Sequence, residues 1–214
     1  MKLLHPDIPT DLVAVGDLTT RLRSDDRLRG LQVDQADLAG RRLKGTAIEE
    51  SLLTKVDFSQ TQIERFALKD CRLVDCDLTA CGLAESSWHV VEAMGCRCSG
   101  LQLQNSQLKN ILFKSCKLDL VNFRFAKLEN VRFEDCLINE LDFYNATLKN
   151  VDFIGSTIED IGFAGAHLKN VDLSEAQIVG IKSATGLRGV TINYEQLTFL
   201  APYFAQELNI DIKN

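Results

Sequence analysis

Apolar residues return at every fifth position through most of this chain. The pattern is clearest over residues 108–186, where successive twenties begin LKNILFKSCK, LENVRFEDCL, LKNVDFIGST and LKNVDLSEAQ. A period of five fits neither the 3.6-residue period of a helix nor the two-residue period of a strand. The nested period of twenty indicates that four fives form one larger repeating unit. We therefore predict a coil with four short sides.

A second inward position lies two residues before each apolar centre. It holds small or β-branched residues, such as Ala126, Val131, Ala146 and Val151, whereas the other three positions are mostly polar. Each five-residue unit is thus expected to form one short side of the coil and one corner. The five-residue repeat runs from Leu28 to Ile178 and predicts nearly eight coils. It weakens over residues 85–100, where we expect an imperfect coil; the alternative is a loop that preserves the register.

The two ends of the chain depart from the five-residue repeat. Residues 1–27 contain Pro6 and Pro9 and place Arg23 at a centre, so they are predicted to form an N-terminal cap. Residues 28–192 form the stack. Residues 193–214 are predicted to form a helix that is capped by Asn193 and interrupted or kinked at Pro202. Its candidate contacts either cover the last coil or form a homodimer seam, and they are Leu197, Leu200, Phe204 and Leu208.

Several units, at residues 36–40 (ADLAG), 151–155 (VDFIG) and 171–175 (VDLSE), match or come near the motif A(D/N)Lxx, with Leu or Phe at the centre. The chain resembles the pentapeptide-repeat family over roughly residues 28–192. This resemblance implies an all-β protein, a right-handed quadrilateral parallel β-helix. With coils about 4.8 Å apart, eight coils form a rod of about 35–40 Å.

The period of twenty places like residues above one another. Phe113, Phe133 and Phe153 should form one internal ladder, and Phe123, Phe143 and Phe163 a second ladder on the opposite side. At one corner, Asn110, Asn130, Asn150 and Asn170 should stack with hydrogen bonds between their amides.

No residue pattern points to catalysis, a metal or a cofactor. Six of the seven cysteines lie two places before a centre and Cys98 lies at one, which predicts small core residues in a reducing, cytoplasmic environment. Cys76, Cys96, Cys116 and Cys136 are twenty apart, in a line that does not suit tetrahedral zinc. His5, His89 and His167 have no recognisable catalytic partners. No long apolar segment indicates a signal peptide or a membrane span.

Charge is distributed unevenly over the four sides. The net charge is −6, and within residues 106–185 the four sides carry +3, −3, −3 and +1, the last from Arg124, Asp142 and Lys182. Two neighbouring sides are acidic, and we take them as the candidate interaction surface. The second side holds Glu134, Asp135, Asp152, Asp172 and Glu175, and the third side holds Asp119, Glu140, Glu159 and Asp160. The alternative is an ordinary solvated surface that keeps the rod soluble.

These features favour a non-enzymatic module that presents a rigid, partly acidic surface to another protein, as a monomer or a homodimer. The family resemblance implies an alternative, a bacterial DNA mimic that binds DNA gyrase or topoisomerase IV and protects it from quinolones or other gyrase poisons. Duplex DNA of the same length would carry about 22 phosphates, so the net charge of −6 supports only partial mimicry. The negative charge argues against direct binding of nucleic acid.

Overall fold

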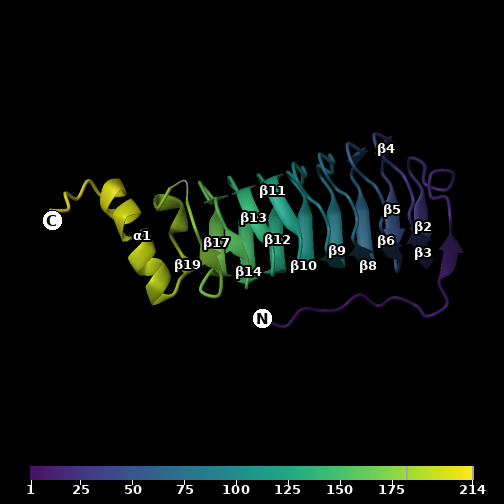
Figure 1. Cartoon of the computed structure of the whole chain (residues 1–214). Helices are drawn as coiled ribbons and strands as arrows, with labels where there is room; N and C mark the ends of the chain where they lie inside the picture. The colour runs from purple at the N-terminus through teal and green to yellow at the C-terminus, as the bar shows by residue number, and fades with distance from the viewer. Residues whose placement is uncertain (182, 214) are drawn as a thin grey trace.

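The chain winds into a solenoid of parallel strands, as Figure 1 shows. The computed structural model describes residues 1–181 and 183–213, so Lys182 and Asn214 lie outside the described residues. Within this range the principal sheet has ten rungs in one continuous order, which makes about nine turns. These rungs are β1 (Val13–Val15), β3 (Leu31–Asp34), β6 (Leu52–Thr54), β8 (Ala67–Val74), β9 (Ser87–Met94), β10 (Gln107–Lys114), β12 (Lys127–Glu134), β14 (Thr147–Ile154), β17 (His167–Asp172) and β19 (Val190–Thr191). The predicted β-helix is confirmed.

The remaining strands complete the coils. The first sheet also includes β2 (Arg27–Arg29) and β5 (Ala47–Glu49). A second sheet consists of β11 (Lys117–Asn122), β13 (Leu137–Asp142), β15 (Thr157–Ile158), β16 (Ile161–Gly162) and β18 (Gln177–Ile178). A third pairs β4 (Arg42–Lys44) with β7 (Gln62–Glu64). Partners such as Leu108 and Leu128 lie twenty residues apart, so the period in the sequence is the length of one turn.

The predicted N-terminal cap over residues 1–27 is wrong. Val13 pairs with Leu31, so residues 13–27 already belong to the first coil, which has 18 residues, two fewer than the repeat of twenty. The five-residue repeat predicted Arg23 at the inward position. In the structure Leu22 takes that position and is fully buried, whereas Arg23 is exposed. The shift by one residue hides this coil from a search at a strict period of five. Residues 1–12 do not cover the end of the stack but run back along its side (Figure 1).

Residues 85–100 form a regular coil, in agreement with the interpretation preferred over a loop. β9 pairs along its whole length with β8 and with β10. Trp88 occupies the central position and is 1% exposed, and its ring lies 6.3 Å from that of Phe113. The large indole fills the space beside two small central residues, Ala93 and Cys98.

Both phenylalanine ladders are present in the core. The Phe133 ring stacks between those of Phe113 (5.1 Å) and Phe153 (4.8 Å), with interplanar angles of 5° and 10°. On the opposite side the Phe143 ring stacks on that of Phe123 at 5.1 Å. The ladders meet edge to face, since the Phe123 and Phe133 rings lie 6.4 Å apart at 76°. Such contacts add to the burial of the rings and resist deformation of the rod.

The corners depend on a left-handed backbone conformation. Every fifth residue from Asp25 to Gly155 has a positive φ between about 49° and 72°, whatever its side chain. Asparagine tolerates this region better than most residues. The predicted asparagine ladder is confirmed: Nδ2 of Asn130, Asn150 and Asn170 each donates to Oδ1 of the asparagine twenty residues earlier, at 3.1, 2.9 and 2.9 Å.

The stack ends in a short 3₁₀ helix, η1 (Thr185–Leu187), and a helix, α1 (Tyr194–Glu207). Asn193 caps α1 as predicted, in a reciprocal capping box with Gln196. Of the two outcomes predicted for Pro202, an interruption or a kink, the interruption does not occur, because α1 continues to Glu207. Buried residues on either side of the proline, Leu200 and Ala205, hold the helix together across it.

Candidate protein-binding surface

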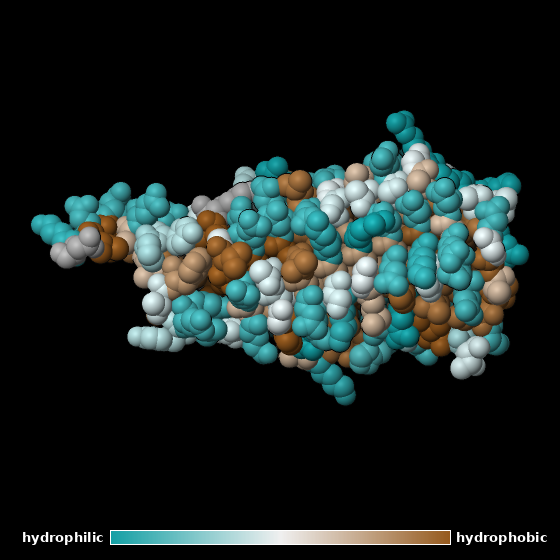
Figure 2. Space-filling model, in the orientation of Figure 1, coloured by the Kyte–Doolittle hydropathy of each residue, from teal (hydrophilic) through white to brown (hydrophobic). Residues whose placement is uncertain are grey.

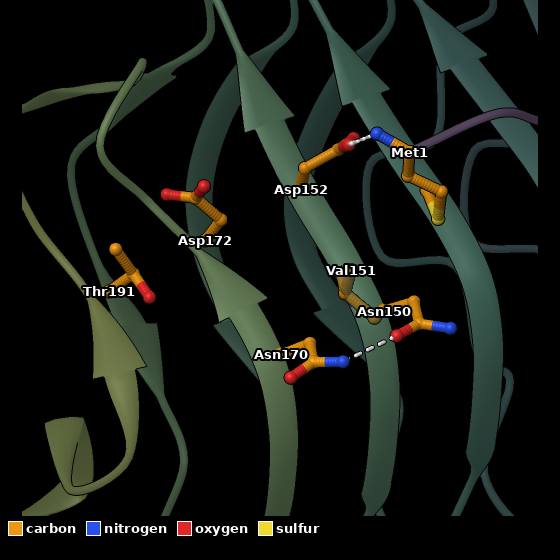
Figure 3. Close-up of a pocket in the computed structure, with 7 residues that line it drawn as sticks. All are labelled: Met1, Asn150, Val151, Asp152, Asn170, Asp172 and Thr191. Atoms are coloured by element: carbon orange, nitrogen blue, oxygen red, sulfur yellow. Dashed lines mark hydrogen bonds and ion pairs between the residues drawn. The ribbon is translucent and has the colours of Figure 1, made fainter.

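The second side of the solenoid has an open groove near its C-terminal end (Figure 3). Asp152 and Asp172 stand in register on β14 and β17, and Thr191 on β19 continues the row. Asn150 and Asn170 line the groove beside them, and Met1 closes one end. The volume is about 470 Å³. Asp152 and Asp172 thus stand on adjacent rungs whose backbones lie about 4.8 Å apart.

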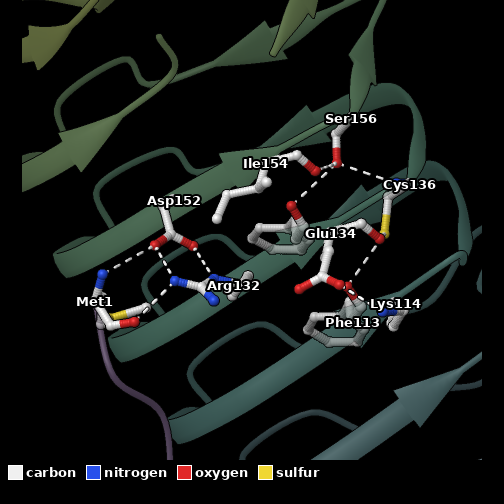
Figure 4. Close-up of polar contacts among 10 residues, drawn as sticks. Met1, Phe113, Lys114, Arg132, Glu134, Cys136, Asp152, Ile154 and Ser156 are labelled. Atoms are coloured by element: carbon white, nitrogen blue, oxygen red, sulfur yellow. Dashed lines mark hydrogen bonds and ion pairs between the residues drawn. The ribbon is translucent and has the colours of Figure 1, made fainter. Parts of the chain in front are cut away.

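The two carboxylates of the groove differ in their partners. Asp152 accepts two hydrogen bonds from Arg132, from Nε at 2.8 Å and from Nη2 at 2.9 Å (Figure 4). Asp172 accepts a hydrogen bond from the backbone N–H of Ser174 at 2.9 Å. In the described part of the chain, no cation lies within 4.0 Å of Asp172. Asp152 is thus paired with Arg132, and Met1 N lies 3.8 Å from its Oδ2, so Asp172 is the groove carboxylate whose charge has no such partner among the described residues.

The other predicted acids of the second side lie toward its edge. Lys114 Nζ lies 2.5 Å from Glu134 Oε1, so this carboxylate is also paired (Figure 4). Asp135 and Glu175 lie at the same corner, two turns apart, with Gly155 between them. These charges extend the acidic region beside Asp172 rather than line the groove.

The third side forms a separate surface. Asp119 is paired with Lys117 at 3.0 Å and also accepts a hydrogen bond from Ser99. Glu140 borders a shallow groove of about 200 Å³, and Glu159 and Asp160 follow one turn later. The nine predicted acids thus occupy two sides of the rod, and ion pairs neutralise part of the charge on each.

The first side carries the lysines that gave it a positive sum. Glu129 lies between Lys149 (2.7 Å) and Lys109 (3.4 Å). The hydrogen bond from Lys149 and the charges of both lysines hold the pKa of Glu129 below its ordinary value. Lys127 and Lys169 lie on the same side, so the first side is basic and contrasts with the second.

An exposed aromatic cluster lies next to the third side and was missed by the sequence analysis. Phe125 is 50% exposed, and its ring meets that of Tyr144 edge to face at 5.7 Å. The Arg124 guanidinium lies 4.8 Å from the centre of the Tyr144 ring. Two aromatic residues at outward positions of neighbouring coils were the available signal.

The C-terminal helix covers the last coil through the polar side chain of Gln196 and through apolar side chains, among them Leu200, Tyr203 and Phe204. Gln196 is buried, and its Nε2 donates to the carbonyl oxygens of Leu173 and Ala176, both at 2.7 Å. Leu200 is fully buried and Phe204 packs against the core. Leu197 and Leu208, also predicted as contacts, are exposed. Figure 2 shows that apolar side chains gather at this end of the molecule.

The histidines and cysteines lie apart from the groove. The His5 Nδ1 atom lies 2.8 Å from Glu92 Oε1, and His167 is exposed on another side. All seven cysteines are free and buried, and burial raises the pKa of the Cys71 thiol to about 12. Among the described residues, no cluster of three or more His, Cys, Asp or Glu could hold a metal ion. None of the helices described is long and apolar enough to cross a membrane.

Comparisons with known proteins agree with the repeat and the fold. A family model described as a pentapeptide repeat region matches residues 86–163 and 112–183. A search of curated proteins finds no match. A trypsin-treated form of QnrB1, described as a plasmid-mediated fluoroquinolone resistance protein, is 20% identical with a TM-score of 0.55, over 94% of this chain and 98% of that one. Full-length QnrB1 is 18% identical with a TM-score of 0.48, over 90% and 96%. HetL, a pentapeptide repeat protein of the cyanobacterium Nostoc, is 17% identical with a TM-score of 0.24, over 74% and 85%.

Proposed function

This chain is a pentapeptide-repeat protein, and we propose that it is a non-enzymatic, cytoplasmic binding module whose acidic groove receives a basic surface of another protein. The observation that carries the proposal is the row formed by Asp152 and Asp172 in an open groove of about 470 Å³. Among the described residues no cation lies within 4.0 Å of Asp172, so this carboxylate offers a place for a partner's cation, and Asn170 adds polar groups beside it.

The rigidity of the solenoid supports this role. Strand pairing, the phenylalanine ladders and the asparagine ladder all fix the backbone beneath the groove. A surface that is ordered before binding loses little conformational freedom on binding, which favours affinity. Complementary charge increases the rate and specificity of association.

Within this proposal, DNA gyrase or topoisomerase IV is the specific partner to test. The solenoid fold is like that of QnrB1, whose described role is fluoroquinolone resistance. An acidic rod side is the chemistry that a DNA-binding surface would accept. Pairing of Glu134 and Asp152 with cations leaves only part of this charge free, so we expect binding to depend on Asp135, Asp172 and Glu175.

The experiment is a gyrase supercoiling assay with and without a quinolone. The groove variant combines Asp172→Asn, inside the groove, with Asp135→Asn and Glu175→Gln at its edge. The charge-matched control neutralises three exposed acids of the N-terminal half, by Asp34→Asn, Glu64→Gln and Glu85→Gln. In the presence of the quinolone, we expect the native chain and the control to restore supercoiling at micromolar protein. The groove variant should require a concentration at least about tenfold higher, which corresponds to a loss of about 1.4 kcal/mol in binding free energy.

Two results would contradict the proposal at different levels. If the native chain neither inhibits nor protects gyrase, gyrase is not the partner. If the groove variant acts as well as the native chain, the partner uses neither Asp172 nor the acids at the edge of the groove.

A further inference from the structure

The N-terminal segment, residues 1–12, lies along the same side of the rod as the acidic groove. It leaves the first coil at Leu12 and runs back toward the C-terminal end, reaching the level of β12 and β14 (Figure 1). Asp7 donates its N–H to Asp70 at 3.4 Å, His5 contacts Glu92, and the Met1 carbonyl accepts from Arg132 Nη2 at 2.8 Å. Six extended residues span about 20 Å, which matches the four rungs, about 19 Å, from Asp70 on β8 to Asp152 on β14, whose Oδ2 lies 3.8 Å from Met1 N.

The contacts that hold the segment are few and lie at the surface. None of its twelve residues is buried. Among the described residues, the first backbone hydrogen bond to the solenoid is donated by Val13, to the Gly30 carbonyl at 2.8 Å. Segments with few buried groups and no backbone ladder open locally at a small fraction of the free energy of global unfolding. Detachment therefore leaves the solenoid intact.

The segment covers the continuation of the groove. One outward column rises through Arg72, Glu92, Leu112, Arg132 and Asp152, on successive rungs. The same column then continues to Asp172 and Thr191, which line the open groove (Figure 3). The Glu92 side chain is only 7% exposed, and Asp152 is 15% exposed. Met1 stands at the boundary between the covered and the open part of the column.

We propose that residues 1–12 form a detachable strap over the acidic groove, and that an extended basic segment of a partner protein displaces it. The strap itself indicates the required chemistry. It presents an imidazole to Glu92 and a main-chain carbonyl to Arg132. A displacing segment thus needs a cation near Glu92, a carbonyl near Arg132 and a further cation for Asp172. This inference rests on the proposed function for its partner, but the strap and the groove can be tested without that partner.

The test uses His5→Glu in the full chain, which places two carboxylates together at Glu92. The matched control is His167→Glu, which adds the same charge at an exposed histidine on another side. Carboxylates are labelled with a water-soluble carbodiimide and glycine methyl ester, and the rate at each site is measured by mass spectrometry. We expect His5→Glu to raise labelling of Glu92 and Asp152 at least about threefold, and His167→Glu to leave both rates as in the native chain. Equal rates in all three proteins would show that no strap covers these groups.

The second measurement uses fluorescein-labelled decalysine as the basic, extended probe. We expect the His5→Glu chain to bind it at least about threefold more tightly than the His167→Glu chain, since the closed strap reduces the fraction of competent molecules. Equal affinities would refute displacement. The same two variants are then compared for binding to gyrase. If the native chain and both variants all fail to bind gyrase, gyrase is not the partner. The labelling and decalysine results would still show whether the strap covers the groove and can be displaced.

Discussion

The corner asparagines provide a measurable test of what holds successive turns together. Asn130 has a φ of 55°, donates through Nδ2 to Asn110 at 3.1 Å and accepts from Asn150 at 2.9 Å. Asn145 has nearly the same φ, 52°, but the positions twenty residues before and after it hold Phe125 and Gly165. The same substitution at the two sites therefore separates the backbone conformation from the amide ladder.

The expected cost follows from these two contributions. Alanine in the left-handed region costs about 1–2 kcal/mol. Each lost amide hydrogen bond costs about 0.5–1.5 kcal/mol. Asn130→Ala should thus lower the free energy of unfolding by about 2–5 kcal/mol, and Asn145→Ala by about 1–2 kcal/mol. Asn130→Gly keeps the corner conformation and should cost less than Asn130→Ala.

The assay is urea unfolding followed in parallel by circular dichroism and by the fluorescence of Trp88, the one tryptophan of the chain. Agreement of the two curves tests whether the solenoid unfolds as one unit, which repeat proteins do not always do. Equal losses for Asn130→Ala and Asn145→Ala would show that the ladder contributes no stability. A larger loss for Asn130→Gly than for Asn130→Ala would refute the argument from the left-handed corner.

Three further predictions concern the core, the C-terminal end and pH. Phe133→Ala removes the middle ring of a ladder and should cost about 3–5 kcal/mol in urea unfolding, against less than about 1 kcal/mol for the exposed Phe125→Ala; equal losses would contradict the ladder's role. Gln196→Ala removes two hydrogen bonds and takes the Gln196 donor from the Ala176 carbonyl, whereas the Leu173 carbonyl still accepts from the Ala176 N–H at 2.9 Å. The change should cost about 1–3 kcal/mol, seen as faster hydrogen exchange in α1; unchanged exchange there would contradict this role. Burial tends to raise the pKa of Glu92, but hydrogen bonds from His5 and an arginine outweigh it and lower the pKa below 4.5. The stability that Glu92 contributes is thus present above pH 4.5 and is lost as pH falls through the lowered pKa. In Glu92→Gln the free energy of unfolding should therefore fall less steeply at acid pH than in the native chain. An equally steep fall in both proteins would refute this argument.

The candidate surface was only partly predictable from the sequence. Sorting charges by side placed Asp152 and Asp172 together, because residues twenty apart occupy the same column of the solenoid. It did not show that Arg132 pairs with Asp152, since a side-chain contact depends on rotamers as well as on register. Of the four predicted C-terminal contacts, Leu200 and Phe204 face the core, because the orientation of α1 is set by its docking on the last coil.

The sequence by itself determined the period, and through it the fold. A centre every five residues and a like residue every twenty leave one way to bury Phe113 and Phe133, which is to stack them in successive turns. Tertiary structure alone decided the course of residues 1–12 and the end of the groove at Met1. The physical reason is the difference in what specifies each part. The repeats bury apolar groups in a pattern that recurs along the chain, whereas the strap has no period and is positioned by a few contacts, such as that of His5 with Glu92, between residues far apart in sequence.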